Sequence, residues 1–337
     1  MKRILSIQSH VVSGYVGNKA ATFPLQLLGY DVDAINTVQF SNHTGYNHCK
    51  GERTPSSTVV DLYEGLKLNG LDNYTSLLTG YMGNPESIEV VAHILTQLRE
   101  SNPELFYVLD PVLGDDGQLY VHKDMIELYK QKLLPYANLI TPNQFETELL
   151  TGTTIRTQDD VLQAMDQLHA LGVDHVVMTS AELTGLAPNT TAAGDHAPRL
   201  HLFGSQRLPT SVNDPDACAT YQRFRIDFPK LQGYFTGTGD LCCALLLAHL
   251  PQTMDDSIQD SLAVPGHLAQ ACEQVIATMA AIMGRTLAAQ QAAGIEFQPN
   301  LPRSQRPSEL VRYCELKLIQ SRNEILAPVV QHRATIL

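Results

Sequence analysis

Apolar residues follow two alternating patterns along this chain. Short apolar or alternating runs predict strands over residues 4–8, 31–40, 76–80, 105–109, 139–140, 175–178 and 224–228. Stretches with apolar side chains every three or four positions predict helices over residues 18–28, 57–69, 85–100, 122–133, 143–150, 157–171, 238–249 and 266–293. This order of strand and helix predicts an α/β fold whose mostly parallel central sheet carries helices on both faces.

Three stretches depart from this alternation. Residues 41–54 are polar and predict a loop or short hairpin, and residues 312–319 favour a last short strand or helix. Residues 181–222 are rich in Thr, Ala, Pro, Gly and Asn, which favours an irregular surface excursion with at least one flexible loop and a strand at 199–203. We find no internal repeat and no linker, so we expect a single domain over residues 1–337.

The overall composition excludes several classes of protein. The net charge of −12 argues against a protein that binds nucleic acid or an anionic membrane surface. The apolar stretch at residues 4–7 is too short for a signal peptide, and no window approaches the roughly 20 apolar residues of a membrane span, so we expect a cytoplasmic protein. The six cysteines include no C-x-x-C pair, which indicates reduced thiols rather than a disulfide framework or zinc site.

One glycine-rich turn has the features of an anion site. Gly237-Thr238-Gly239-Asp240 precedes the apolar run at 241–247, which predicts a buried helix. A turn of this kind directs free backbone N–H groups and the positive end of the helix dipole at one place, which suits a phosphate. Asp240 is the unusual member, since an anion repels a carboxylate. Alternatively, Asp240 is an ordinary first-turn residue that interacts favourably with the dipole, and the glycines form a plain turn.

Polar side chains also gather at the ends of predicted strands. They are Ser9, Asp110, Asp115, Asn143, Glu146, Thr179 and Ser180. Because the carboxyl ends of parallel strands meet at one edge of an open sheet, and ligands bind at that edge, we expect these side chains to share one site.

An anion site beside a carboxylate, with more carboxylates at neighbouring strand ends, suggests phosphoryl transfer. Asp240 would take the proton of an attacking hydroxyl, and the other carboxylates would hold Mg²⁺ or water around a nucleotide. The chain has no G-x-x-x-x-G-K-[ST] sequence and no protein-kinase motif set. A dinucleotide fingerprint fails as well, because Cys242 occupies the third small position and the turn comes late in the chain.

Simpler interpretations exist for several of these residues. Asp110 before Pro111 suits a strand-end turn, and Asn143 with Glu146 suits an ordinary helix N-cap. Tyr81 is either a core-edge aromatic or a stacking wall. His43 and His48 lie in a polar loop without a third ligand in register, which argues against a metal site there. Cys242 and Cys243 fit small core positions.

Taken together, the motifs resemble those of the pyridoxal kinases, in the ribokinase-like superfamily. The resemblance covers residues 3–180 and residues 231 to the C-terminus. The most specific motifs are Ser41-Asn42-His43-Thr44-Gly45-Tyr46 and Thr141-Pro142-Asn143-Gln144-Phe145-Glu146, and Ser6 to Val11, Gly14 to Asn18, Leu78 to Tyr81, Asp110 to Asp115 and Gly237 to Asp240 also match. The resemblance implies a three-layer α/β/α fold with about nine strands in its central sheet, and a homodimer.

The resemblance also implies an activity and a role for each matching residue. The chain would use ATP to phosphorylate the 5′-hydroxymethyl group of pyridoxal, and also pyridoxine and pyridoxamine, in vitamin B6 salvage. Asp240 would be the catalytic base, and Gly237, Thr238 and Gly239 would hold the phosphate. Ser9 would hydrogen-bond the pyridine ring, Val16 and Tyr81 would pack on it, and Thr44 would complete this pocket.

The remaining matches concern the nucleotide and its cations. Nucleotide-side positions are Asp115, Tyr120, Asn143, Glu146, Thr179 and Ser180, and Leu231 and Phe235 would border the adenine. Asp110, Thr141 and Glu146 would hold Mg²⁺ or another divalent ion and K⁺, and residues 112–121 would form a short flap over the nucleotide.

This sequence also departs from the family pattern. Residues 181–222 do not align, the flap is short, and Thr236 stands where an apolar residue is expected. A hydroxymethylpyrimidine or sugar kinase of the same superfamily, or a non-catalytic vitamer-binding relative, is the alternative.

Overall fold

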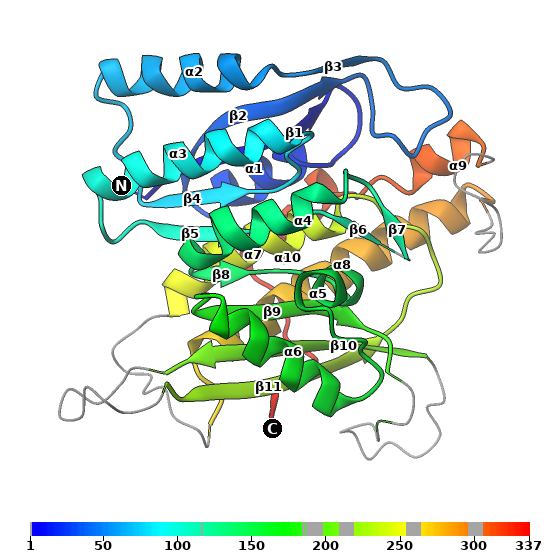
Figure 1. Cartoon of the computed structure of the whole chain (residues 1–337). Coiled ribbons are helices and arrows are strands. Elements are labelled where there is room, and N and C mark those ends of the chain that lie inside the picture. Colours follow the sequence, from blue (N-terminus) through cyan, green and yellow to red (C-terminus); the bar gives the residue numbers. More distant parts are fainter. Residues whose placement is uncertain are drawn as a thin grey trace.

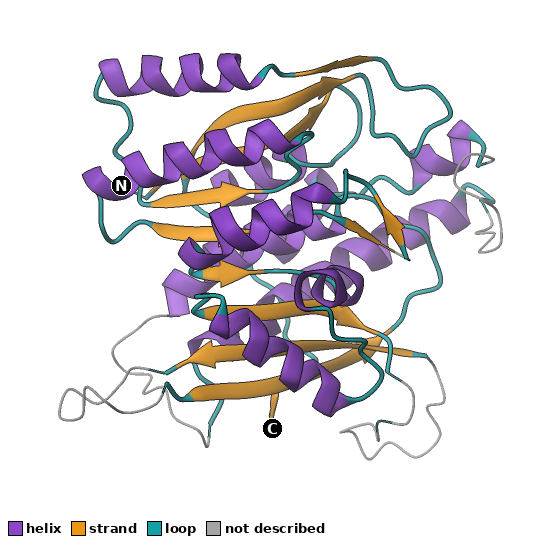
Figure 2. Cartoon of the chain, in the orientation of Figure 1, coloured by secondary structure: helices purple, strands orange, loops and turns teal. Residues whose placement is uncertain are grey.

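The central sheet has ten strands in the order β12-β11-β10-β9-β8-β5-β4-β1-β2-β3 (Figures 1 and 2). The computed structural model describes residues 2–115, 117–183, 186, 198–208, 219–253, 264–295 and 306–337. The strands are β1 (Arg3–Val11), β2 (Asp31–Phe40), β3 (Gly51–Arg53), β4 (Ser76–Thr79), β5 (Phe106–Leu109), β8 (Leu139–Ile140), β9 (His175–Ala181), β10 (Arg199–Arg207), β11 (Tyr221–Pro229) and β12 (Thr335–Ile336). From β2 to β9 neighbouring strands are parallel, and β3, β10, β11 and β12 pair antiparallel at the two sides.

Helices cover both faces of this sheet, as the alternating pattern predicts. One face packs against α2 (Ser56–Leu68), α3 (Pro85–Ser101), α4 (Asp124–Leu128), α5 (Gln144–Thr151) and α6 (Gln158–Ala170). The other packs against α1 (Asn18–Leu27), α7 (Thr238–Thr253), α8 (His267–Ala292) and α10 (Arg322–Leu326). Apolar side chains fill the space between each helical layer and the sheet. The three-layer α/β/α fold is therefore confirmed, with helices on both sides of the strands (Figure 2).

The direction in which the strands are added reverses at β1. Strand β2 follows β1 and lies on one side of it, whereas β4, the next parallel strand, lies on the other side. The connecting helix α1 covers one face, while α2 and α3 cover the opposite face. A reversal of this kind opens a crevice beyond the carboxyl ends of the strands, because the chain leaves them toward opposite faces.

The structure confirms some of the remaining predicted elements and refines the form of others. The polar stretch 41–54 contains the short strand β3, in agreement with the predicted hairpin. The predicted helix at 122–133 is confirmed as helical but is irregular: α4 is followed by a π-helical turn (Tyr129–Leu133), and a 3₁₀ turn with Pro135 (Leu134–Tyr136) ends the segment. The flap contains a two-stranded hairpin of β6 (Gly114–Asp115) and β7 (Gln118–Leu119). Helix α9 (Ser308–Tyr313) ends just inside the stretch 312–319.

The expectation of a surface excursion at 181–222 is wrong for its middle part. Strand β10 runs to Arg207 rather than to residue 203, and it lies inside the sheet between β9 and β11 with residues 201–206 buried. Its polar residues make the strand look exposed in the sequence. They can be buried because His201 hydrogen-bonds to Asp227 and Ser205 hydrogen-bonds to His169. The predicted flexible loop falls largely on residues 187–197 and 209–218, which lie outside the described residues.

Candidate active site

A cavity of about 620 Å³ lies at the carboxyl edge of the parallel strands, where β1 separates β2 from β4. Every residue that the sequence assigned to the site lines it, except Leu231, which is half-buried and does not reach the cavity wall. The assigned residues that line it are Ser9, Val16, Thr44, Tyr81, Asp110, Asp115, Tyr120, Thr141, Asn143, Glu146, Thr179, Ser180, Phe235, Gly237, Thr238, Gly239 and Asp240. The fold therefore brings together segments that are more than 200 residues apart in the chain.

The turn before α7 forms one wall of this cavity. Gly237 has φ +79°, and a Cβ atom there would overlap the backbone oxygen of Tyr15, so only glycine fits. Helix α7 begins at Thr238, and its first residues line the cavity while residues 241–250 are buried. The free N–H groups at the start of α7 therefore lie at the cavity wall, where they can bind an anion.

Asp240 lies in the first turn of α7, beside the cavity. Desolvation raises the pKa of its carboxyl group, and a hydrogen bond from the Gly17 backbone N–H opposes that rise. Gly17 precedes α1, so this bond joins the starts of two helices. A carboxylate with a raised pKa is a better base for a hydroxyl proton than an ordinary aspartate.

Two further carboxyl groups are buried close to Asp240. Asp110 follows β5 and is 5% exposed, and a Cβ atom on Gly239 would lie 3.7 Å from Asp110 Oδ2. Burial raises the pKa of Asp110 well above its ordinary value, and the charges of Glu146 and Asp240 add to the effect. Asp110 repels both Glu146 and Asp240 when the groups are ionised, so a cation beside Asp110 would be stabilised.

Glu146 has a structural role as well as a place in the cavity. It forms a capping box with Asn143 at the start of α5: Glu146 Oε2 accepts from Asn143 N at 2.9 Å, and Asn143 Oδ1 accepts from Glu146 N. Its Oε1 atom accepts from Leu113 N at 3.0 Å. Burial raises the pKa of Glu146 to about 7 even though these backbone donors lower it. The simpler N-cap interpretation is thus confirmed, and it coexists with a position in the cavity wall.

The flap lies against the same cap. Asn143 Nδ2 donates to the carbonyl oxygen of Gly114 at 2.8 Å, which fixes the β6–β7 hairpin on α5. Asp115 and Tyr120 of this flap line the cavity, and Tyr120 is 41% exposed. The Asn143 side chain therefore connects the flap to the strand ends.

The sequence interpretation gave no individual role to several further lining residues, which lie in or just after β1, β2 and β3, in the flap, and just before α7. Val11, Val38, Phe40, His43, Gly45, Arg53, Val112, Gly114, Tyr234 and Thr236 also face the cavity. Alternation along β2 was a usable signal for Val38 and Phe40, because residues two apart in a strand share a face. No local signal marks Arg53 or Tyr234, which reach the site only through the fold.

Other chemistry is not favoured by the described residues. Among them, no group of three or more His, Cys, Asp and Glu side chains is arranged to hold a metal ion, and His43 contacts Glu315 rather than His48. Cys49, Cys242, Cys243, Cys272 and Cys314 are free thiols, and Cys218 lies outside the described residues. No helix in the described ranges is long and apolar enough to span a membrane.

Comparison with known proteins places this arrangement in a family. The family model for phosphomethylpyrimidine kinase matches residues 71–261. A pyridoxal kinase of Bos taurus is 43% identical over 99% of this chain and 98% of its own length. The structures of the Leishmania donovani pyridoxal kinase with ADP and ginkgotoxin, and with ADP and pyridoxamine, superpose with TM-scores of 0.81 and 0.79 at 30% identity, each covering 100% of both chains. The chain belongs to the pyridoxal kinase family.

Proposed function

We propose that this chain is an ATP-dependent kinase that phosphorylates the 5′-hydroxymethyl group of pyridoxal, and also of pyridoxine and pyridoxamine. The product from pyridoxal is pyridoxal 5′-phosphate, the end of a vitamin B6 salvage reaction. The observation that carries the proposal is Asp240 beside the glycine turn of α7, in one cavity with the strand-end residues, in a chain 43% identical to a pyridoxal kinase over nearly its whole length. The related enzyme of Leishmania donovani has been solved with ADP and pyridoxamine together.

In this proposal Asp240 acts as the general base. Its carboxylate takes the proton from the 5′-hydroxyl group while the oxygen attacks the γ-phosphorus of ATP. A new O–P bond forms, and the bond between the γ-phosphorus and the bridging oxygen of ADP breaks. The raised pKa of Asp240 suits this proton transfer.

The turn at 237–239 stabilises the charge that gathers on the transferring phosphoryl group. Its backbone N–H groups and the positive end of the α7 dipole lie at the cavity wall next to Asp240. Because Gly237 is held against Tyr15, these donors are already in place before substrate binds. Positioned donors of this kind stabilise a transition state without reorganising during the reaction.

Two recognition regions then share the cavity. Ser9, Val16, Thr44 and Tyr81 lie at the end formed by β1, β2 and β4, and we assign them to the vitamer. Asp115, Tyr120, Asn143, Glu146, Thr179 and Ser180 lie toward β8, β9 and the flap, and Phe235 precedes α7; we assign all of them to the nucleotide. Asp240 and the glycine turn line the same cavity as both groups.

We also assign the cation sites to this region. Asp110 and Glu146 are buried acids whose mutual repulsion a cation would relieve, so the residues fit Mg²⁺, which commonly uses one or two carboxylates together with phosphates and water. Thr141 Oγ1 is buried without a hydrogen bond of good geometry among the described residues, although the weak Cys243 thiol is close, and this atom fits K⁺. A bound divalent ion would neutralise phosphate charge during transfer.

The proposal is tested by offering the purified protein pyridoxal, hydroxymethylpyrimidine and ribose with ATP and Mg²⁺. We expect kcat/KM for pyridoxal to exceed the other two by at least about 100-fold, because a pocket of positioned polar groups rejects substrates that leave them without partners. Formation of ADP that does not depend on pyridoxal would contradict the proposal. Preference for hydroxymethylpyrimidine or ribose would instead favour another small-molecule kinase of the same superfamily.

We further propose that the protein works in the cytoplasm as a homodimer. Sedimentation equilibrium tests the assembly, and a mass of twice the 37.1 kDa chain is the expected result.

A further inference from the structure

Glu315 is a buried carboxylate that connects the cavity wall to a distant part of the chain. It follows α9 and is 7% exposed. Its backbone forms a parallel bridge with Thr236, the residue immediately before the glycine turn at 237–239. Glu315 does not line the cavity, so it is placed to support the site and not to touch substrate.

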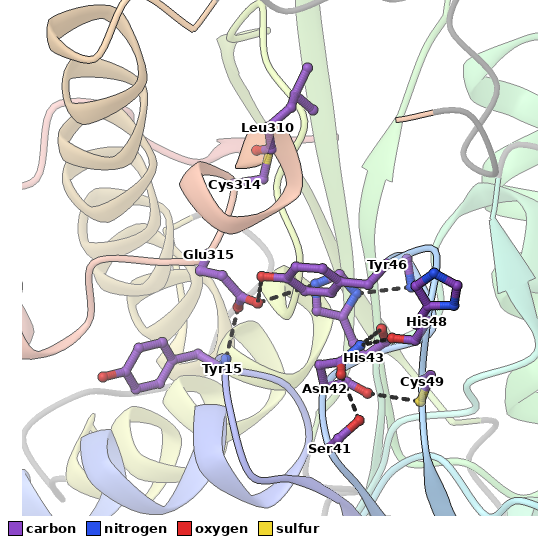
Figure 3. A network of polar contacts seen from close by, with 11 residues as sticks. Tyr15, Ser41, Asn42, His43, Tyr46, His48, Cys49, Leu310, Cys314 and Glu315 are labelled. Atoms are coloured by element: carbon purple, nitrogen blue, oxygen red, sulfur yellow. Dashed lines mark hydrogen bonds and ion pairs between the residues drawn. The ribbon is translucent and has the colours of Figure 1, made fainter. Parts of the chain in front are cut away.

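The Glu315 side chain faces two segments that do line the cavity (Figure 3). Its Oε2 atom accepts from the backbone N–H of Tyr15 at 2.9 Å, one residue before Val16. Its Oε1 atom accepts from the Tyr46 hydroxyl at 3.2 Å and lies 3.3 Å from His43 Nε2. Tyr46 and His43 flank Thr44, which we assign to the vitamer pocket.

The second ring nitrogen of His43 is held by a hydrogen bond within the loop. The backbone N–H of Gly45 donates to His43 Nδ1 at 3.1 Å, so Nδ1 is an acceptor and the neutral ring carries its proton on Nε2. That Nε2–H group faces Glu315 in an alignment that does not meet hydrogen-bond geometry, so the contact is chiefly electrostatic. His43 Nδ1 is thus held within the loop, and Nε2 faces Glu315 outside it.

The backbone is shaped to admit this carboxylate. Gly14 has φ +98°, and a Cβ atom there would overlap both Glu315 oxygens.

The Tyr46 hydroxyl remains a hydrogen-bond donor at neutral pH. Burial first, and then the charge and hydrogen bond of Glu315, raise the pKa of Tyr46. The base of the loop is closed separately, because Asn42 Nδ2 donates to the carbonyl oxygen of His48 at 2.9 Å (Figure 3).

We propose that Glu315 is a positioning residue that fixes the loop 41–49 and the Tyr15 turn against the start of the 236–240 segment, and so sets the affinity for the vitamer. The carboxylate accepts hydrogen bonds from the Tyr15 N–H group and the Tyr46 hydroxyl and lies beside His43 Nε2, and its own backbone holds the third segment. Its removal leaves a buried N–H group and hydroxyl without their acceptor, which frees the loop. This role rests on the proposed pyridoxal kinase activity and deepens it.

The test compares Glu315→Ala with Glu315→Gln in steady-state kinetics. For Glu315→Ala we expect KM for pyridoxal to rise about tenfold, which corresponds to the loss of one net hydrogen bond. KM for ATP should change less than about twofold, because the backbone bridge between residue 315 and Thr236 does not depend on the Glu315 side chain, so the glycine turn keeps its support. Glu315→Gln keeps one acceptor oxygen and should recover part of the affinity for pyridoxal.

A matched control separates positioning from general destabilisation. Glu273 in α8 is also buried and also holds a distant segment, through Ala334 N at 2.9 Å and Arg333 Nη1 at 2.6 Å, away from the cavity. Glu273→Ala should lower the melting temperature as much as Glu315→Ala without changing KM for pyridoxal. Equal changes in both KM values of Glu315→Ala, or a matching rise in Glu273→Ala, would overturn the proposal.

Amide hydrogen exchange provides a measurement that does not depend on activity. Peptides covering residues 41–49 and 12–17 should exchange about tenfold faster in Glu315→Ala than in the wild type and in Glu273→Ala. Unchanged exchange in both peptides would refute the positioning role even if the kinetics changed. Absence of phosphate transfer by the wild-type protein would refute the proposed function, and the exchange data would still decide the role of Glu315.

Discussion

Asp240 shows how little a single residue reveals about its own role. Its sequence context fits an ordinary first-turn acid of a helix, and α7 does begin two residues before it. What distinguishes Asp240 is its neighbours in the folded chain, namely the Gly17 N–H group, the buried Asp110 carboxyl group and the cavity. The first-turn interpretation of Asp240 is therefore confirmed, and its role as a catalytic base stays a prediction that its chemistry must test.

Substitution of Asp240 by Asn tests its proposed role as a base. We expect kcat with pyridoxal to fall by about 100-fold or more, because the amide cannot accept the hydroxyl proton. The dissociation constant for ADP, measured by calorimetry, should stay within about threefold. Asp227→Asn is the control, since Asp227 is a buried acid bonded to His201 and outside the cavity. A near-wild-type kcat in Asp240→Asn would exclude the general-base role.

His249 is a buried imidazole that the proposed reaction does not use. It lies in α7, is 3% exposed, and neither ring nitrogen has a hydrogen-bond partner among the described residues. Desolvation lowers its pKa to about 4. Its protonation therefore favours the unfolded chain, where the ring has its ordinary pKa near 6.5.

The stability of the protein should depend on pH through His249. Between about pH 6.5 and pH 4 the unfolded chain binds a proton that the folded chain does not, so the free energy of unfolding falls as pH falls, by up to about 3 kcal/mol. His249→Leu should remove this part of the dependence and should stabilise the protein at pH 5. Urea unfolding of both proteins from pH 4 to pH 7 measures the difference, and parallel curves would contradict the prediction.

Strand β10 shows how an element can be hidden in its sequence. Its residues 201–206 are buried within the sheet, yet they include His, Ser and Gln, so they lack the apolar signature of a central strand. Pairing with β11 sets the register of β10, and in that register Gly204 lies opposite Phe224. A Cβ atom on Gly204 would overlap the Phe224 ring, so this glycine makes room for an aromatic side chain across the strand pair.

Two glycine substitutions should have opposite effects on stability. Gly204→Ala should lower the free energy of unfolding by about 1–3 kcal/mol, because the Phe224 ring must move in a packed core. Gly284→Ala, within α8 and with open space around its Cβ position, should raise it by about 0.5–1 kcal/mol. Denaturant titration measures both changes, and a stable Gly204→Ala variant would show that the Phe224 ring adapts at little cost.

At the scale of the whole molecule, the cavity exists only in the folded chain. Its walls come from the first strand, from α5 and from the start of α7, and two separate apolar cores support them from the two faces of the sheet. Ligands that occupy the cavity should therefore bind the folded state and not the unfolded one.

Ligand binding should accordingly stabilise the entire protein. ADP at 100 times its dissociation constant should raise the free energy of unfolding by about 2.7 kcal/mol, and pyridoxamine should add to this rise. Thermal melts with each ligand and with both together measure the effect, and Asp240→Asn should still respond to ADP. A melting temperature that is independent of ADP would contradict the assigned nucleotide region.

Much of the fold could be predicted because it depends on local patterns. The spacing of apolar residues in 85–100 and the short apolar runs at 76–80 and 105–109 determined α3, β4 and β5, since side-chain period reports secondary structure directly. Parallel strands then placed Ser9, Asp110 and Asn143 at one edge, and the family motifs supplied the residues around them.

Tertiary structure alone decided what depends on contacts between distant segments. The burial of β10, the failure of Leu231 to reach the cavity, and the presence of Arg53 and Tyr234 in its wall have no local signature. The same is true of Glu315, whose carboxylate meets Tyr15 and Tyr46 across about 300 and 269 positions of the chain. The sequence by itself determined the elements and the chemical groups, because periodicity and motifs are local, whereas the neighbours of each group depend on how the whole chain packs.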